Sequence, residues 1–180
     1  MIEKRKFGKT DMEVSVLGFG GAEIGYEGAP QSDVDRLLNE ALDAGLNVID
    51  TAECYMDSEE KIGRALSHRR KDFYLFTKCG HADGGGADWS RPALLRSIER
   101  SLQRLRTDCV DLVQLHSCDL ATLKAGEVIE ALEEARQRGW TRYIGYSGDG
   151  QAALYAVETG RFDSLEISIN VADQEAIDLV

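Results

Sequence analysis

Four side chains that can transfer or orient protons lie at or just beyond the ends of short apolar runs. Asp50, Lys78 and His116 each end such a run, and Tyr55 comes five positions after Asp50. Each has an ordinary structural explanation when taken alone, as a turn acid, a snorkelling lysine, a hydrogen-bonded histidine or a packing tyrosine. If the runs are parallel strands, however, their carboxyl ends meet at one edge of the sheet. The four side chains then form a site suited to proton transfer.

These residue types in combination indicate a general acid. The positive charge of Lys78, itself held by Asp50, favours phenolate over phenol, so we expect the pKa of Tyr55 to fall below its ordinary value of about 10. Tyr55 would then donate a proton near neutrality, and His116 would orient a carbonyl oxygen by hydrogen bonding. The same residues are equally compatible with an enzyme in which Lys78 forms a Schiff base with a carbonyl substrate. The chemistry alone leaves both readings open.

The elements that must position these side chains are six apolar runs that alternate with segments of helical spacing. The expected strands are Val14–Leu17, Leu46–Ile49, Phe73–Thr77, Val110–Leu115, Tyr143–Tyr146 and Leu165–Ile169. Their centres recur about every 31 residues, which is the size of a parallel βα crossover. Residues 5–14 are expected to form a small β-hairpin that turns between Gly8 and Asp11 and plugs one end of the fold.

Two architectures show this alternation, a doubly wound sheet and a (β/α)8 barrel. A dinucleotide-binding doubly wound sheet would carry G-x-G-x-x-G after its first strand, but Glu23 stands where the third glycine should be. A barrel instead draws its chemistry from several strand ends. Those ends are Asp50, Lys78, His116, Ser147 and Asn170. We therefore predict an α/β fold, a (β/α)8 TIM-type barrel with an N-terminal β-hairpin, truncated after about six βα units because eight need about 250 residues.

The composition of the chain argues against some kinds of binding partner and some cellular locations. The 180 residues carry 21 Lys and Arg against 32 Asp and Glu, a formal charge of −11, which disfavours a nucleic-acid partner. No apolar run reaches the roughly 18 residues of a membrane span, and the first residues lack a signal-peptide pattern. We therefore expect a cytoplasmic protein with no membrane partner. The four cysteines lack the spacing of a zinc site or disulfide framework, and no metal ligand is predicted.

The sequence resembles the aldo-keto reductases, a family of NAD(P)H-dependent (β/α)8 barrels that reduce aldehydes and ketones. The resemblance runs from Arg5 to about Asp173. It is carried by an ordered set of motifs, namely residues 47–55 (NVIDTAECY), 58–63 (SEEKIG), 76–78 (FTK) and 111–116 (DLVQLH). It implies that residues 1–180 are a single, C-terminally incomplete domain, the N-terminal three-quarters of such a barrel.

The resemblance also implies roles for individual residues. Tyr55 would be the proton donor, Lys78 and Asp50 would tune it, and His116 would position the carbonyl, with hydride coming from the nicotinamide. The implied cofactor-binding residues are Asp50, Ser147, Glu166 and Asn170, and the expected substrate wall contains Tyr26, His81 and Trp89. The expected cofactor is NADP(H) rather than NAD(H), and the expected substrate is a small carbonyl compound or alcohol.

Two positions depart from the family pattern. Gly148 occupies a place that is usually asparagine, and Glu166 aligns with the usual glutamine of the sixth strand. Glutamine both donates and accepts hydrogen bonds, whereas an ionised glutamate only accepts, which alters recognition of the nicotinamide carboxamide.

A non-catalytic alternative accounts for the same residues, a truncated barrel that acts as an interaction or regulatory module. The family holds the cofactor phosphates with loops after strands seven and eight, which this sequence does not contain. We expect the 180-residue chain by itself to lack reductase activity. Six strands also leave two exposed sheet edges, which favour self-association.

Overall fold

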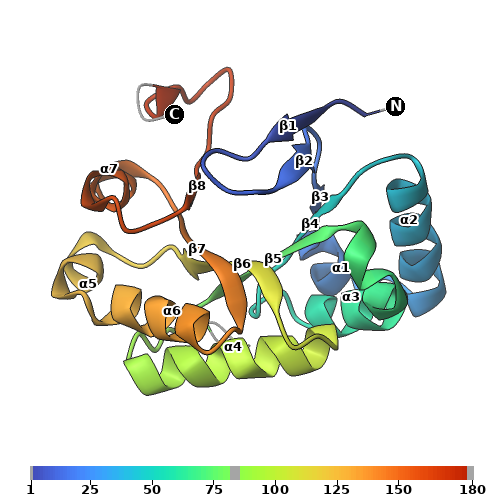
Figure 1. Cartoon of the computed structure of the whole chain (residues 1–180), viewed down its shortest axis with the longest axis horizontal. Coiled ribbons are helices and arrows are strands. Elements are labelled where there is room, and N and C mark those ends of the chain that lie inside the picture. The colour runs from blue at the N-terminus through green and yellow to red at the C-terminus, as the bar shows by residue number, and fades with distance from the viewer. Residues whose placement is uncertain (1, 82–85, 178–180) are drawn as a thin grey trace.

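The computed structural model describes residues 2–81 and 86–177 and contains a curled sheet of six parallel strands (Figure 1). These strands are β3 Phe19–Gly20, β4 Val48–Asp50, β5 Tyr74–Cys79, β6 Val110–His116, β7 Thr141–Ser147 and β8 Ser164–Glu166. Each strand pairs in parallel with the next one along the chain, so the order in the sheet is the order in the sequence. The arrangement confirms the α/β class and the barrel type, with six of the eight strands of such a barrel in place.

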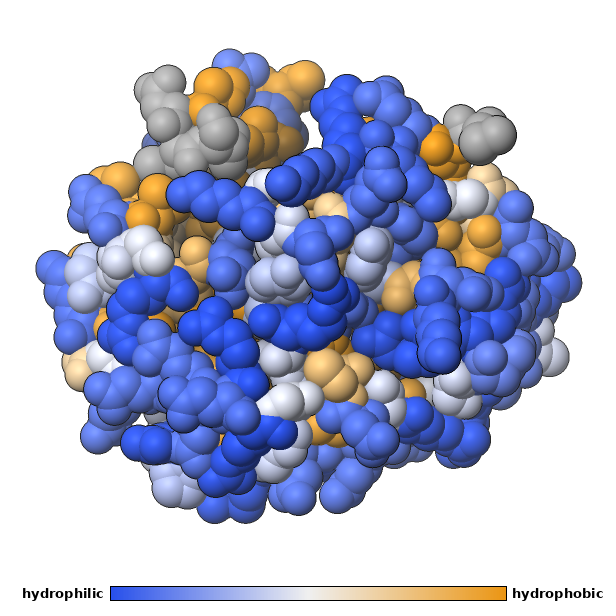
Figure 2. All heavy atoms as spheres, in the orientation of Figure 1, coloured by the Kyte–Doolittle hydropathy of each residue, from blue (hydrophilic) through white to orange (hydrophobic). Residues whose placement is uncertain are grey.

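Helices connect successive strands and cover the outer face of the sheet (Figure 1). Their bounds are α1 Ala22–Tyr26, α2 Gln31–Asp43, α3 Ser58–Leu66, α4 Arg91–Leu105, α5 Leu120–Ala125, α6 Glu127–Gln137 and α7 Gly150–Thr159, with a 3-10 helix, η1, at Ser67–Asp72. Within the described part of the chain, no helix is both long and apolar enough to cross a membrane. The face of the molecule in Figure 2 is largely hydrophilic, with small separate apolar areas.

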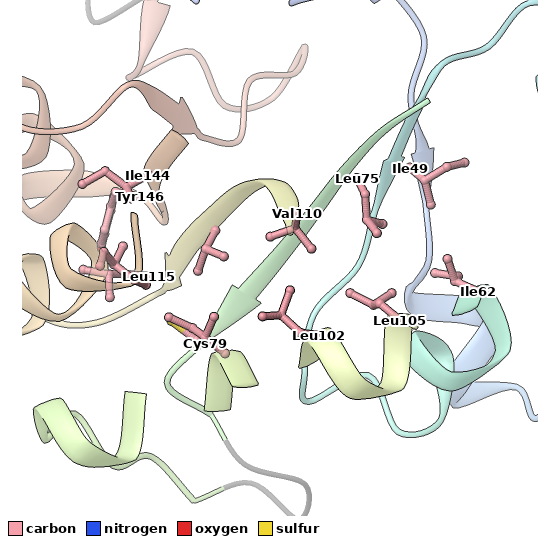
Figure 3. Close-up of a cluster of buried hydrophobic side chains, with 14 of the residues drawn as sticks. Ile49, Ile62, Leu75, Cys79, Leu102, Leu105, Val110, Leu115, Ile144 and Tyr146 are labelled. Carbon is pink, nitrogen blue, oxygen red and sulfur yellow. The ribbon is translucent and has the colours of Figure 1, made fainter. Parts of the chain in front are cut away.

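The main hydrophobic core lies between the sheet and the helices (Figure 3). Leu75 of β5 and Ile49 of β4 point outward to meet Ile62 of α3 and Leu105 of α4, and all four are buried. Alternate residues of a strand point to opposite faces. Because Leu75 faces the helices, Phe76 and Lys78 of the same strand face the barrel interior.

A β-hairpin closes the amino-terminal end of the barrel interior. Its strands, β1 Lys4–Lys6 and β2 Glu13–Ser15, pair antiparallel. Met12 is fully buried against Phe76 and Leu112. Asp11 accepts a hydrogen bond of 2.9 Å from the Tyr143 hydroxyl. The predicted hairpin and its role as a plug are therefore confirmed.

The predicted first barrel strand, Val14–Leu17, is wrong. Val14 pairs with Arg5 inside the hairpin, while Val16 and Leu17 are exposed. The first barrel strand is instead the two-residue β3, in which Gly20 pairs with Asp50. Its contribution is mainly backbone pairing, so no apolar run marks it in the sequence.

The predicted last strand also ends too late. β8 ends at Glu166, whereas the sequence favoured continuation to Ile169, so Asn170 is not the residue that ends this strand. Glu166 takes that place beside Ser147. The set of strand-end residues at the mouth is therefore Asp50, Lys78 with Cys79, His116, Ser147 and Glu166.

The edges of the six-stranded sheet are β3 and β8, each paired on one side only among the described residues. A cavity of about 320 Å³ lies in the barrel interior beside both edges. Its lining includes three aromatic residues, Phe7, Phe19 and Phe76, and four polar residues, Asp50, Gln114, Ser164 and Glu166. The interior is thus open where a complete barrel would be closed by further strands.

Candidate active site

The loop between β4 and α3 carries Tyr55 over the ends of two strands. It continues the pairing of β4 with β5, because Thr51 N donates to Phe76 O at 3.0 Å and Glu53 N donates to Lys78 O at 3.2 Å. Helix α1 packs on the loop from outside through Gly25, where an added Cβ would lie 1.9 Å from the Tyr55 carbonyl oxygen. Only glycine permits this close approach, which fixes the Tyr55 backbone at the mouth.

Lys78 lies at the centre of the mouth and is almost completely buried. Its side chain is 1% exposed, and its Nζ forms an ion pair with Asp50 Oδ2. The same Nζ donates to Thr51 O at 3.2 Å and lies 3.5 Å from Glu166 Oε2. It also lies 5.6 Å from the centroid of the Tyr55 ring. The structure therefore brings Asp50, Tyr55 and Glu166 around one ammonium group.

The charges in this cluster shift one another's protonation. Burial raises the pKa of Asp50 to about 7, an effect that Lys78 opposes and Glu166 reinforces. Burial acts to lower the pKa of Lys78, but the attraction of Asp50 and then Glu166 outweighs it, so that pKa is raised. Lys78 consequently carries its charge at neutral pH.

The expectation of a lowered pKa for Tyr55 is wrong for this structure. Burial of the phenol is the largest influence and raises its pKa. Lys78 acts to lower that pKa, but Asp50 and Glu166 act in the opposite direction. Tyr55 is therefore a protonated phenol at neutral pH, held beside a charged lysine that would stabilise the phenolate once the proton has left.

His116 faces the Tyr55 ring from the end of β6. The two ring centroids are 5.7 Å apart with an interplanar angle of 83°. Burial, followed by the charges of Lys78 and His81, lowers the pKa of His116 to about 4. The imidazole is thus neutral at pH 7 and keeps one N–H donor. Its Nδ1 lies 3.5 Å from Cys54 Sγ, which leaves Nε2 as the other ring nitrogen for a bound molecule.

Two of the three residues predicted for the substrate wall make ring contacts with catalytic candidates, and the third packs on one of these two. Tyr26 lies 5.7 Å from Tyr55 between ring centroids, and His81 lies 5.5 Å from His116. Trp89 packs edge-on to His81 at 5.3 Å. The structure therefore places all three at the mouth, as a continuous row of aromatic rings.

Ser147 and Glu166 are neighbours across the pairing of β7 with β8. The Ser147 hydroxyl can donate a hydrogen bond, and the Glu166 carboxylate can accept one. Together they match a primary carboxamide, which has a carbonyl oxygen that accepts and N–H groups that donate. Two further acceptor atoms are buried nearby, Asp50 Oδ1 and Gln114 Oε1, and neither has a hydrogen-bond partner among the described residues. The donor and acceptor chemistry at this end of the cavity therefore fits the nicotinamide end of a pyridine nucleotide.

Asn170 lies apart from this group, in the segment that follows β8. Its Oδ1 accepts backbone hydrogen bonds from Ala172 at 2.8 Å and Asp173 at 3.1 Å, and the residue is exposed. The structure thus shows Asn170 forming a turn, and the cofactor role that the resemblance implies for it stays a prediction. Across residues 2–81 and 86–177, no three His, Cys, Asp or Glu side chains are grouped so as to hold a metal ion.

A buried polar cluster behind the loop escaped the sequence analysis. Glu59 is 1% exposed and accepts a hydrogen bond of 2.7 Å from Thr77 Oγ1, next to Lys78. Arg104 of α4 donates to the Glu53 carbonyl oxygen at 3.3 Å and lies 3.6 Å from the Glu59 carboxylate. The Glu53 carboxylate, also buried, is held by Ser97 and Arg100 of the same helix.

This cluster ties the Tyr55 loop to the strand that carries Lys78. Its signal in the sequence is the spacing of Ser97, Ser101 and Arg104, polar residues that share one face of a helix otherwise recognised by its leucines. The partners Glu53 and Glu59 lie 38 to 51 residues earlier in the chain, so the spacing indicates a polar face but not what it binds.

Comparison with known proteins agrees with this geometry. Residues 16–177 match the sequence pattern described as the Aldo/keto reductase family. The chain is 37% identical over 153 residues to an uncharacterized oxidoreductase, YqkF, of Bacillus subtilis, covering 81% of this chain and 49% of the relative. It is 36% identical over 156 residues to L-galactose dehydrogenase of Arabidopsis thaliana, covering 82% and 49%. The chain therefore spans about half the length of these curated relatives.

Solved structures of longer chains contain the same fold. A putative aldo-keto reductase from Pseudomonas aeruginosa superposes with a TM-score of 0.92 and 32% identity, over 98% of this chain and 70% of that one. The holo form of an aldo-keto reductase from Bacillus halodurans superposes with a TM-score of 0.88 and 32% identity, over 99% and 61%. The strand-end cluster, the barrel topology and the match over residues 16–177 lead to one conclusion: the chain belongs to the aldo/keto reductase family.

Proposed function

We propose that this chain carries the catalytic residues of an NAD(P)H-dependent oxidoreductase that reduces an aldehyde or ketone to an alcohol, or catalyses the reverse reaction. The observation that supports this most strongly is the burial of charged Lys78 between Asp50 and Tyr55, with neutral His116 against the same phenol ring. A positioned phenol, a cation beside it and a neutral hydrogen-bond donor are what proton delivery to a carbonyl oxygen needs.

Tyr55 acts as the general acid in this proposal. Its raised pKa keeps the proton on the phenol until the carbonyl oxygen gains negative charge. Lys78 then stabilises the phenolate, and Asp50 keeps Lys78 charged and in place. His116 donates a hydrogen bond that orients the carbonyl oxygen, while Tyr26, His81 and Trp89 form an aromatic wall for the rest of a small substrate.

The nicotinamide supplies hydride when it is bound. Ser147 and Glu166 would hold its carboxamide, since they offer a hydroxyl and a carboxylate side by side at the ends of β7 and β8. Asp50 would contribute an acceptor through Oδ1, and Asn170 belongs to the proposal only through the family resemblance. The preference for NADP(H) over NAD(H) likewise rests on the resemblance alone.

The domain organisation, self-association and location of the protein are also proposals. We infer that residues 1–180 belong to one barrel domain that is incomplete without further strands, and that the exposed edges of β3 and β8 promote self-association of the isolated chain. A cytoplasmic location rests on the composition. An interaction module without catalysis is the alternative function.

A Schiff-base enzyme on Lys78 is less well supported. Such an enzyme needs an unprotonated amine as nucleophile. Lys78 is instead an ammonium group paired with Asp50 and close to Glu166, with a raised pKa.

Replacement of Tyr55 by phenylalanine tests the proposal. In the protein that carries this chain, carbonyl reduction followed by NADPH absorbance should fall by at least about 10²-fold, the usual effect of losing a general acid. Binding of NADPH, followed by fluorescence, should be nearly unchanged. Tyr155→Phe on α7 is the matched control, because it also removes one phenol oxygen but lies on the outer helix layer.

Three outcomes contradict the proposal. Wild-type turnover in the Tyr55→Phe variant removes Tyr55 from the mechanism. Failure of the unaltered protein to oxidise NADPH or NADH with any of a panel of aldehydes and ketones supports the interaction module instead. Trapping of a carbonyl substrate on Lys78 by borohydride supports the Schiff-base reading.

A further inference from the structure

Two carboxylates compete for one buried ammonium group at the mouth of the barrel. Asp50 Oδ2 is paired with Lys78 Nζ, and Glu166 Oε2 approaches the same nitrogen to 3.5 Å from the opposite side of the open barrel. When all three groups are ionised, the cluster carries a net charge of −1. With a neutral residue at position 166 it would carry no net charge.

Glu166 is held in this position by the sheet. It ends β8 in register with Ser147, and its carbonyl oxygen accepts a hydrogen bond of 3.0 Å from Gly148 N. Its side chain is 47% exposed, so water screens its charge more than that of Asp50, whose side chain is 24% exposed. Glu166 is therefore the weaker of the two partners of Lys78.

We propose that Glu166 is a second counter-ion of Lys78 that reduces the ability of the lysine to acidify the Tyr55 phenol. Each carboxylate near the ring disfavours a phenolate, and a second carboxylate beside Lys78 offsets the one cation that favours it. Glu166 is in this sense a positioning residue, since it acts on Tyr55 through the field around Lys78. The importance of this effect for catalysis rests on the proposed function, but the effect on the phenol does not.

Several other groups also act on Lys78 and Tyr55. Asp50 faces them from β4, Cys54 from the loop, and His116 from β6. Tyr26 of α1 packs on the Tyr55 ring as a neutral phenol. Among these groups only Glu166 lies on β8, so its charge can be removed while the Asp50–Lys78 ion pair stays in place.

The test is an alkaline titration of Tyr55 in the purified protein that carries this chain, read by tyrosinate absorbance. Subtracting the curve of Tyr55→Phe from that of the unaltered chain isolates the Tyr55 midpoint. The same subtraction is then made in a Glu166→Gln background. We expect the Tyr55 midpoint to fall by about half to one pH unit, at the low end of charge-pair effects because Glu166 is half exposed. Circular dichroism at each pH confirms that the fold persists.

Two further variants make the result specific. Glu158→Gln removes the same charge from the carboxyl end of α7, on an exposed part of the helix, and should leave the midpoint unchanged. Glu166→Thr removes the charge with a residue suited to a strand, and provides a second reading if glutamine perturbs β8.

An unchanged or higher Tyr55 midpoint in both neutral variants, with the fold retained, overturns the proposal. So does an equal fall in Glu158→Gln, which would show only a general effect of net charge. Neither outcome depends on turnover, so failure here is distinguishable from failure of the Tyr55→Phe activity test.

Discussion

Asp50 and Asp111 are buried or part-buried aspartates of the same sheet that lie at opposite ends of the barrel. Asp111, near the start of β6, has both oxygens occupied: Oδ2 accepts from Arg70 at 2.7 Å and from Leu75 N at 2.9 Å, and Oδ1 accepts from Arg142 at 2.6 Å. Asp50, at the end of β4, shares Lys78 with a second carboxylate, and its Oδ1 has no partner among the described residues.

The different pairing of these two aspartates indicates that the two ends of the barrel have different roles. At the amino-terminal end both oxygens of the buried Asp111 carboxylate are paired, which holds β5, β6 and β7 together. At the carboxyl-terminal end, two carboxylates share one lysine and Asp50 Oδ1 has no hydrogen-bond partner among the described residues. This arrangement destabilises the fold locally, but it leaves polar groups that a bound molecule can pair with. Barrels generally place stability at the first end and chemistry at the second.

Replacement of Asp111 should have the largest effect on stability. Asp111→Asn leaves both arginines without the carboxylate and turns one acceptor oxygen toward them into an N–H donor. We expect a loss of about 2–3 kcal/mol in the free energy of unfolding, less than for a fully buried pair because the arginines are partly exposed. Urea unfolding followed by circular dichroism measures it. Asp108→Asn, an exposed change three residues earlier, should cost almost nothing. Equal stability of the two variants would contradict the assignment of Asp111 as a structural charge.

His116 should make stability depend on pH at the opposite end. Its pKa of about 4 in the fold lies below its ordinary value of about 6.5, so between these pH values the unfolded chain binds a proton that the folded chain does not. Stability from this group is therefore fully present above pH 6.5 and falls as the pH is lowered toward 4.

Comparison of the unaltered chain with His116→Gln isolates this contribution. The difference in unfolding free energy between pH 7 and pH 5 should be larger in the unaltered chain by about 1 kcal/mol, after allowance for water around the ring. Urea unfolding at the two pH values measures the difference. A smaller difference in the unaltered chain would mean that His116 is charged in the fold.

The smallest expected effect concerns cofactor affinity at Glu166. Glu166→Gln restores a hydrogen-bond donor beside Ser147, and NADPH should bind more tightly by about 0.5–1 kcal/mol, the net value of one hydrogen bond. Isothermal titration calorimetry on the protein that carries this chain measures the change, with Glu158→Gln as the control for net charge. Weaker binding would show that Glu166 does not lie beside the carboxamide.

The sequence was informative where side chains alternate along buried strands. Lys78 and His116 alternate with the same register as apolar residues of their own strands, so each is expected on the same face as those residues. Because both residues lie at the carboxyl ends of parallel strands, they are also expected at the same end of the barrel. β3 was missed because Phe19–Gly20 contributes backbone pairing and little side-chain signal. The family motifs indicated Tyr55, but not the direction of its pKa shift, since burial by rings from distant segments decides that balance.

The Arg104 contacts with Glu53 and Glu59 were also beyond prediction. They join α4 to a loop and a helix much earlier in the chain, and a polar helix face gives no indication of its partner. The cofactor role of Asn170 stays a prediction from the family resemblance, and the structure shows only that its Oδ1 completes a local turn.

The hairpin has a consequence for the order of folding during synthesis. Each parallel strand pairs with the one made just before it, so the sheet can grow as the chain leaves the ribosome. The hairpin precedes all of them, yet Asp11 binds Arg142 and Tyr143, which are 131 and 132 positions later. Contacts of such long sequence separation form slowly because a large loop must close first. A segment made at the outset is therefore among the last to reach its native partners.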